Sequence, residues 1–331
     1  MRFPLADWID THRECRYDLA SSGMRGSIPP PRWPARRPPP GIGEELVPEL
    51  ARYLGVPPAR VFVSHGASEA NAWVLGFLAR ELPREGRARV ARVRYPEYPP
   101  LFDTARAFGF EIQEGKAESG VAVVSRPRNP EGDLWSSDVL AGFADGARHL
   151  VVDETFREFA RVPSLAQEGR PRLWTTGSFT KFFGADEIRV GFAVAPPDSC
   201  DRFGRYVGLV SDEVAPASAA VALSLLRDLE TVRSAVRGVL DRNLRALTAR
   251  LPGARPPVAP LYFDRLHRGS GRRLAERCLG ASVLVCPGSY FGDPRGVRLC
   301  LTRKDFPRAL GAYLDVRDRP GTARSAGTAG V

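Results

Sequence analysis

One lysine stands in a setting suited to covalent chemistry. The 331-residue chain holds only three lysines, and Lys181 ends the motif Ser178-Phe179-Thr180-Lys181 after an apolar run. A lysine amine condenses with an aldehyde when its surroundings lower its pKa. The two hydroxyls of this motif, with the guanidinium of Arg189, are groups that bind a dianionic phosphate. An ordinary lysine on a surface loop explains this motif equally well.

A second motif favours anion binding by the backbone. Gly66-Ala67-Ser68-Glu69 follows the apolar run 61–64 and opens a helical pattern. The glycine permits a tight turn, and the amides of Ala67 and Ser68 at the helix start attract negative charge. The alternative is an ordinary strand-turn-helix connection in which Ser68 caps the helix.

Two carboxylates end another apolar run. Asp153 and Glu154 follow the run 150–152. The carboxyl ends of inner strands are where open α/β sheets bind ligands, and a buried carboxylate there needs a cationic partner. A protonated pyridine nitrogen would serve, although a helix cap or a structural ion pair fits the residues as well.

Two turn motifs could contribute further ligand-binding groups, one polar and one aromatic. Asn129-Pro130-Glu131-Gly132 follows the run 121–124 and would place the Asn129 amide near the end of a strand. Tyr95-Pro96-Glu97-Tyr98-Pro99 would present the ring of Tyr98 to a flat ligand. Each is otherwise a plain turn, and packing is the commoner fate of such a tyrosine.

The elements that position these motifs alternate between strand and helix from residue 44 onwards. Apolar runs of strand length predict inner strands covered on both faces, and intervening helices require crossovers that make the sheet largely parallel. The fold class is therefore α/β, with a three-layer αβα large domain. The expected strands are 61–64, 89–93, 121–124, 150–152, 173–179 and 192–195, and the expected helices are 44–54, 67–82 and 99–108.

Composition and hydrophobic spacing divide the rest of the chain into segments. Residues 1–43 are expected to be an irregular proline-rich segment, because proline fixes φ and lacks an amide donor. The large domain covers 44–217. Leucines and valines spaced by three or four between 225 and 251 predict one long helix leading into a smaller α+β domain within 218–316. Residues 317–331, rich in small residues, are expected to be disordered.

Composition excludes several classes of function. The net charge is +10, but nearly all basic residues are scattered arginines, which favours an anionic small substrate over nucleic acid. The chain has no apolar run of membrane-spanning length and no secretory signal. Five cysteines without paired spacing predict reduced thiols, a cytoplasmic protein and no metal site.

In their order and spacing, the motifs between about residues 44 and 303 resemble those of the class I/II (fold type I) aminotransferases that depend on pyridoxal 5′-phosphate (PLP). The nearest branch is that of histidinol-phosphate aminotransferase and threonine-phosphate decarboxylase. The resemblance implies that Lys181 holds PLP as a Schiff base, Asp153 pairs with the pyridine nitrogen, Asn129 bonds the phenolic oxygen and Tyr98 stacks on the ring. The implied phosphate ligands are Ala67, Ser68, Ser178, Thr180 and Arg189.

The resemblance also extends to the substrate. The segment 285–292 followed by Arg298 is similar to the family's PGxxFG motif and carboxylate-binding arginine. It implies transamination of an amino acid or an amino-acid-derived amine, phosphorylated or not, with an oxo-acid acceptor and a homodimer. A PLP-dependent decarboxylase or lyase is the alternative. A PLP-binding regulator or inactive scaffold is disfavoured, because the proline-rich start cannot form a helix-turn-helix.

Three positions depart from the family pattern. Phe156 replaces the usual tyrosine three residues after Asp153, and losing its hydroxyl should raise the pKa of the Schiff base. The stretch 36–40 lacks the tyrosine that normally reaches the partner subunit's phosphate. The segment 17–23 lacks the usual asparagine of the substrate pocket.

Overall fold

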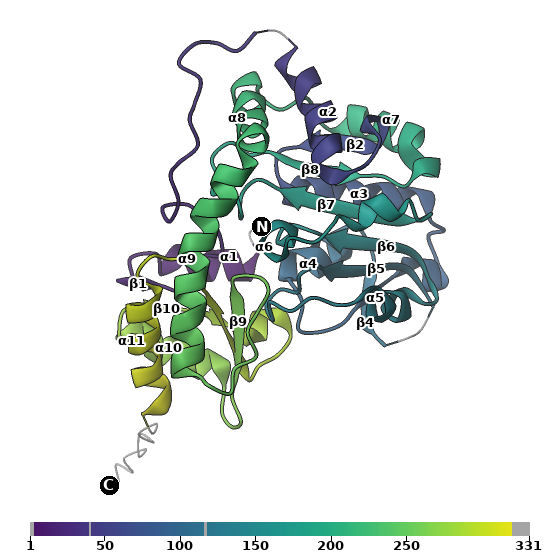
Figure 1. Cartoon of the computed structure of the whole chain (residues 1–331). Helices are drawn as coiled ribbons and strands as arrows, with labels where there is room; N and C mark the ends of the chain where they lie inside the picture. Colours follow the sequence, from purple (N-terminus) through teal and green to yellow (C-terminus); the bar gives the residue numbers. More distant parts are fainter. Residues whose placement is uncertain (1–2, 40, 116–117, 320–331) are drawn as a thin grey trace, which may run out of the picture.

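The computed structural model describes residues 3–39, 41–115 and 118–319. The chain forms a larger body around a seven-stranded sheet and a smaller body around a three-stranded sheet. Figure 1 shows the long helix α9 (Leu229–Arg250) running from the larger body into the smaller one. Within the described part of the chain, no helix is long and apolar enough to cross a membrane.

The large sheet is mostly parallel, as predicted. Its strand order is β2-β8-β7-β6-β5-β3-β4, and β8 is antiparallel to both neighbours while the other pairs are parallel. Its strands are β2 (Val61–Ser64), β3 (Val90–Val93), β4 (Glu111–Glu114), β5 (Ser119–Ser125), β6 (Ala147–Asp153), β7 (Leu173–Ser178) and β8 (Gly191–Val194).

Helices cover both faces of this sheet, which confirms the αβα architecture. Every residue of β5, β7 and β8 is buried, because these strands have apolar neighbours above and below. On β8, Phe192 belongs to the core beneath α2 and α8, whereas Ala193 belongs to the core beneath α3 and α4. The helices of the large body are α2 (Ile42–Leu54), α3 (Ala67–Glu81), α4 (Pro99–Ala107), α5 (Ser137–Ala144), α6 (Arg157–Ala160), α7 (Cys200–Val210) and α8 (Pro216–Arg227).

The smaller body has its own core. Its sheet has the order β11-β12-β9, all antiparallel, and β1 pairs with β10 beside it. Helices pack on this sheet around a separate apolar cluster. Its elements are β9 (Leu261–Arg265), α10 (Gly271–Gly280), β10 (Val283–Leu284), β11 (Cys286–Pro287), β12 (Gly296–Cys300) and α11 (Phe306–Asp318).

The start of the chain corrects one prediction. Residues 4–11 form the helix α1 (Pro4–Thr11) and Tyr17–Asp18 forms β1, so the segment 1–43 is not irregular throughout. Proline suits the first turn of a helix, where an amide donor is not needed. The buried Trp8 fixes α1 on the smaller body by donating from Nε1 to the Val285 carbonyl at 2.8 Å. The described residues of 29–39 contain no helix or strand, and Figure 1 shows this segment as a wide loop.

Two further boundaries differ from expectation. The predicted long helix is divided into α8 and α9, because Asp228 between them has non-helical angles (φ −98°, ψ 21°). Helix α11 reaches Asp318, so the predicted disordered tail begins with helical residues, and its residues 320–331 lie outside the described part.

Candidate active site

All nine residues predicted to hold the cofactor line one cavity. The cavity has a volume of about 500 Å³ and lies at the carboxyl ends of β5, β6 and β7, beside the start of α3. The predicted residues that line it are Ala67, Ser68, Tyr98, Asn129, Asp153, Ser178, Thr180, Lys181 and Arg189. Parallel strands bring their carboxyl ends to one edge, which is why motifs far apart in sequence meet here.

A second cavity of about 760 Å³ adjoins the first and contains Arg298, the residue predicted to bind a substrate carboxylate. The two cavities share Lys181 and Tyr98, so Lys181 lies between the predicted cofactor residues and Arg298. Sequence analysis missed that α1 lines both cavities, with Ala6 and Asp10. The prediction treated residues 1–43 as one irregular segment, although the proline cluster lies at 29–40 and α1 contains only Pro4.

Asp153 is buried and held by neutral donors. It is the last residue of β6 and only 4% exposed. The Thr155 amide donates to its Oδ1 at 2.9 Å, and Asn71 Nδ2 donates to its Oδ2 at 3.0 Å. The Thr176 hydroxyl donates to Asn71 Oδ1 at 2.7 Å and so fixes the orientation of that amide. These hydrogen bonds fix the orientation of the Asp153 carboxylate, and a cation beside it would neutralise its charge.

Asn71 is a site residue that sequence analysis missed. It lies on α3, one turn after Ala67, is 2% exposed and lines the cavity. A lone polar residue inside an apolar helical run was the available signal, since a buried amide needs partners.

Lys181 lies just after β7 and has a lowered pKa. Burial is the larger cause, and the positive charge of Arg298 adds to it. The backbone of the segment is fixed, because the Met24 amide donates to the Lys181 carbonyl at 2.9 Å. A lowered pKa increases the fraction of neutral amine, which is the form that attacks an aldehyde.

One group of lining residues is suited to an anion. Gly66 adopts a φ of +105°, and the amides of Ala67 and Ser68 that follow are first-turn donors without intrahelical acceptors. The Ser178 hydroxyl donates to Thr180 Oγ1 at 2.9 Å and accepts from the Thr180 amide at 3.0 Å, so the two hydroxyls lie together. A Cβ on residue 66 would lie 2.7 Å from Arg189 Nη2, so glycine is required for the arginine to approach the helix start.

Arg298 joins the smaller body to this cavity. From β12 it donates to Asn129 Oδ1 at 3.1 Å and to the Ala20 carbonyl at 2.7 Å. Its Nε is buried without a hydrogen-bond partner. A buried guanidinium with an unsatisfied donor is suited to a carboxylate ligand. The contact also leaves Asn129 Nδ2 as the amide's donor to any ligand in the cavity.

Two aromatic residues form the walls. Burial, followed by the charge of Asp153, raises the pKa of Tyr98 to about 12, so its ring stays neutral. Phe156 stacks on Phe159 with ring centroids 5.8 Å apart and lines the cavity. The departure from the family's tyrosine therefore places an apolar ring, without a hydroxyl, in the wall of the cavity.

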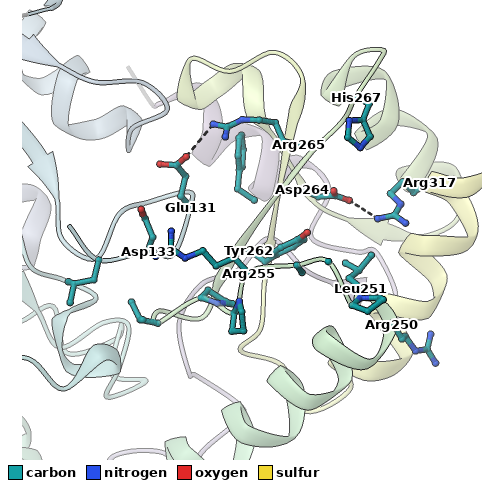
Figure 2. A pocket seen from close by; sticks show the side chains of 18 residues that line it. Glu131, Asp133, Arg250, Leu251, Arg255, Tyr262, Asp264, Arg265, His267 and Arg317 are labelled. Carbon is teal, nitrogen blue, oxygen red and sulfur yellow. Dashed lines mark hydrogen bonds and ion pairs between the residues drawn. The ribbon is translucent and has the colours of Figure 1, made fainter. Parts of the chain in front are cut away.

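Another large cavity lies elsewhere, between the segment 250–258 and β9 (Figure 2). Its volume is about 760 Å³, and no residue predicted to bind cofactor or substrate lines it. Two ion pairs lie in its lining, Glu131 with Arg265 and Asp264 with Arg317. Within the residues that the structure describes, no group of three or more His, Cys, Asp or Glu side chains could hold a metal ion.

The fold and the first cavity define a class of protein. A lysine amine of lowered pKa, a buried carboxylate and a cup of anion donors are the groups that a protein supplies to PLP. The required glycine at 66 and the unsatisfied Nε of Arg298 show that the residues fit a phosphorylated cofactor and a carboxylate substrate. This is the architecture of a PLP-dependent enzyme of the αβα type.

Comparison with known proteins identifies the family. The family model "Aminotransferase class I and II" matches residues 35–312, and the chain belongs to this family. The chain is thus a PLP-dependent aminotransferase, as the motifs predicted.

Curated relatives agree with this assignment. Histidinol-phosphate aminotransferase 1 of Nitrosococcus oceani is 28% identical over 81% of this chain and 77% of its own length. An aspartate aminotransferase of Thermococcus kodakarensis is 27% identical over 80% of this chain and 76% of its own length. The relatives named for histidinol phosphate confirm the predicted branch of the family.

A solved structure agrees with the fold. The aspartate aminotransferase from Thermus thermophilus with maleate superposes with a TM-score of 0.76 at 19% identity, covering 94% of both chains. This likeness confirms the architecture of both domains.

Replacing Asn71 tests how Asp153 is held. Asn71→Leu keeps the branched shape of the side chain but removes a hydrogen bond to a charged group, which contributes about 1.5–3 kcal/mol. We expect the Kd for PLP to rise about tenfold or more, measured by fluorescence titration of the cofactor-free protein. Thr176→Val, which only frees the Asn71 amide, should have a smaller effect. An unchanged Kd in Asn71→Leu would show that this contact does not support the cofactor.

Proposed function

We propose that Lys181 carries PLP and that the chain transfers the amino group of an amino acid, or of an amine derived from one, to an oxo acid. The observation that carries the proposal is the meeting of all nine predicted cofactor residues in one cavity, with Arg298 in the cavity beside it. When bound, PLP supplies an aldehyde that condenses with amines and a protonated ring that accepts the electron pair from the substrate Cα.

The protein residues take distinct roles around that group. Asp153 would stabilise a proton on the ring nitrogen of PLP, and Asn71 donates to Asp153 and so holds the carboxylate in position. Ala67, Ser68, Ser178, Thr180 and Arg189 would hold the phosphate, and Tyr98 would cover one face of the ring. Asn129 would donate from Nδ2 to the phenolic oxygen, because its Oδ1 is engaged by Arg298.

Lys181 also moves protons. The Lys181 side chain lines both the cavity of the predicted cofactor residues and the cavity that contains Arg298. Its lowered pKa lets it take the proton from the substrate Cα as a general base and return it as a general acid. Arg298 would hold the substrate carboxylate throughout, which orients the Cα–H bond toward the lysine.

Transamination is favoured over decarboxylation by the comparisons. The curated relatives described above are aminotransferases, and nothing in the comparisons favours a decarboxylase. The names of these relatives suggest either a phosphorylated amino alcohol or an acidic amino acid as the amine substrate.

We further propose that the protein is a cytoplasmic homodimer. The five cysteines are all free thiols, which suits a reducing compartment. At the end of α7, Leu209 is 76% exposed and Val210 is 51% exposed. Adjacent large apolar side chains open to solvent are typical of a surface that a second copy covers.

Replacing the lysine tests the chemistry. Lys181→Ala should lower the rate of oxo-acid formation from an amino donor by at least about 10³-fold, because the general base and the covalent attachment are both lost. Lys304→Ala, which alters an exposed lysine outside both cavities, should keep the wild-type rate. Turnover retained in Lys181→Ala would contradict the proposed mechanism.

Sedimentation equilibrium tests the assembly. The wild-type chain should sediment at twice the mass of one chain, and the double change Leu209→Glu with Val210→Glu should give monomers, because two charges would enter the apolar contact. Val258→Glu alters a residue that is 45% exposed elsewhere and should leave the dimer intact. A monomeric wild-type chain would refute the dimer, and a dimer of the double variant would place the interface on another surface.

A further inference from the structure

A fully buried carboxylate lies directly behind the cofactor cavity. Glu97 precedes Tyr98 at the start of α4 and is 0% exposed. Its Oε1 accepts from the Tyr98 amide at 2.6 Å and from the Ser125 hydroxyl at 2.5 Å. Its Oε2 accepts from the Ser125 amide at 3.0 Å and from Arg128 Nη1 at 2.7 Å. One carboxylate therefore accepts four hydrogen bonds from three residues.

The first connection from Glu97 leads to the substrate arginine. Ser125 Oγ donates to Glu97 and accepts from the backbone N–H of Asn129 at 2.8 Å, which fixes the backbone that carries the Asn129 side chain. Asn129 in turn accepts from Arg298 at 3.1 Å. These hydrogen bonds have a fixed direction. Because Glu97 accepts the proton of the Ser125 hydroxyl, the serine oxygen is free to accept from the backbone N–H of Asn129.

The second connection leads to the aromatic wall and to the smaller body. Glu97 accepts from the backbone amide of Tyr98 and so fixes the first turn of α4, where the ring of Tyr98 enters both cavities. The Glu97 amide donates to the Phe291 carbonyl at 3.0 Å. Phe291 also packs beneath Arg298, whose guanidinium carbon lies 5.0 Å from the ring centroid.

A buried arginine partly offsets the charge. Arg128 is 1% exposed, and its guanidinium lies 4.3 Å from the ring centroid of Trp135. Burial raises the pKa of Glu97 to about 7, although Arg128 and the hydrogen bonds oppose that rise. The groups that face the carboxylate are Arg128 from the loop after β5, Ser125 from β5 and the Tyr98 amide from α4. Since burying a charge is costly, apolar packing would serve better if only stability mattered.

We propose that Glu97 is a positioning residue for the transamination reaction, which orients Asn129 and Tyr98 and, through Asn129, sets the affinity of Arg298 for the substrate carboxylate. The proposal rests on the function proposed above. Glutamine at this position would offer one acceptor oxygen in place of two, so two of the four donors would lose their partner. The serine hydroxyl and the ring would then lose their fixed orientation.

Two variants separate this role from a purely structural one. Glu97→Gln disturbs both connections, whereas Ser125→Ala interrupts only the path to Asn129 and leaves the ion pair of Glu97 with Arg128 in place. Glu111→Gln, on the exposed edge strand β4, is the matched control. The measurements on the PLP-loaded enzyme are KM and kcat for an amino acid and for the same amine without its carboxylate, together with circular dichroism in the cofactor absorption band.

We expect both variants to keep bound PLP and to raise KM for the amino acid about tenfold or more. KM for the amine without a carboxylate should stay unchanged. Circular dichroism in the cofactor band should weaken in Glu97→Gln. In the wild type, KM for the amino acid should rise as the pH falls below about 7, since a protonated Glu97 loses acceptor capacity. That inflection should be absent from Glu97→Gln, and Glu111→Gln should match the wild type throughout.

Two results would overturn the role of Glu97. One is a wild-type KM in a folded Ser125→Ala or Glu97→Gln enzyme, and the other is an equal loss for both substrates accompanied by a lower Tm. A failure of the proposed PLP-dependent function would give a different result. The wild-type protein would then lack a cofactor absorption band that depends on Lys181. If the wild-type protein shows this band and the KM values of Glu97→Gln and Ser125→Ala equal that of the wild type, only the Glu97 proposal is contradicted.

Discussion

A carboxylate buried at the end of an inner strand is the constraint around which the active site is organised. The hydrogen bonds that hold Asp153 come from an amide side chain and a backbone amide, both neutral. A buried negative charge is costly unless a positive group joins it, and the protonated ring nitrogen of PLP is such a group. In the same way, the Nε donor of Arg298 has no hydrogen-bond partner, and the amides at the start of α3 are suited to a negative group. The protein supplies charges whose partners arrive with the ligand.

The arrangement depends on two bodies meeting at one edge of the large sheet. The carboxyl ends of β5, β6 and β7 belong to the larger body, whereas Arg298 is contributed by the smaller one. The contact of Arg298 with Asn129 crosses between them, and Glu97 secures both sides through Ser125 and the Phe291 carbonyl. In the proposed function, the Asn129 side chain would link substrate recognition to cofactor binding, because it accepts from Arg298 and would donate to the cofactor.

The sequence predicts the structure correctly where a local pattern, such as an apolar run, directly reflects burial in the fold. Runs such as 121–124 are apolar because they are buried on both faces, and the polar residues that follow them, including Asp153, converge because parallel strands end together. Prediction from the sequence failed where the role depends on distant partners: the short helix α1 is held by Trp8, which donates to the carbonyl of Val285, a residue far away in the sequence. Glu97 was visible only as part of a turn, since its burial requires Arg128, thirty-one positions later.

The most direct test of the account is to locate the covalent bond to the cofactor. The PLP-loaded protein would be reduced with borohydride, digested, and its modified peptide identified by mass spectrometry. With only three lysines in the chain, the assignment is unambiguous. The account predicts a pyridoxyl-phosphate adduct on Lys181 and none on Lys304 or Lys116. An adduct on either of those lysines, or none on Lys181, would contradict it.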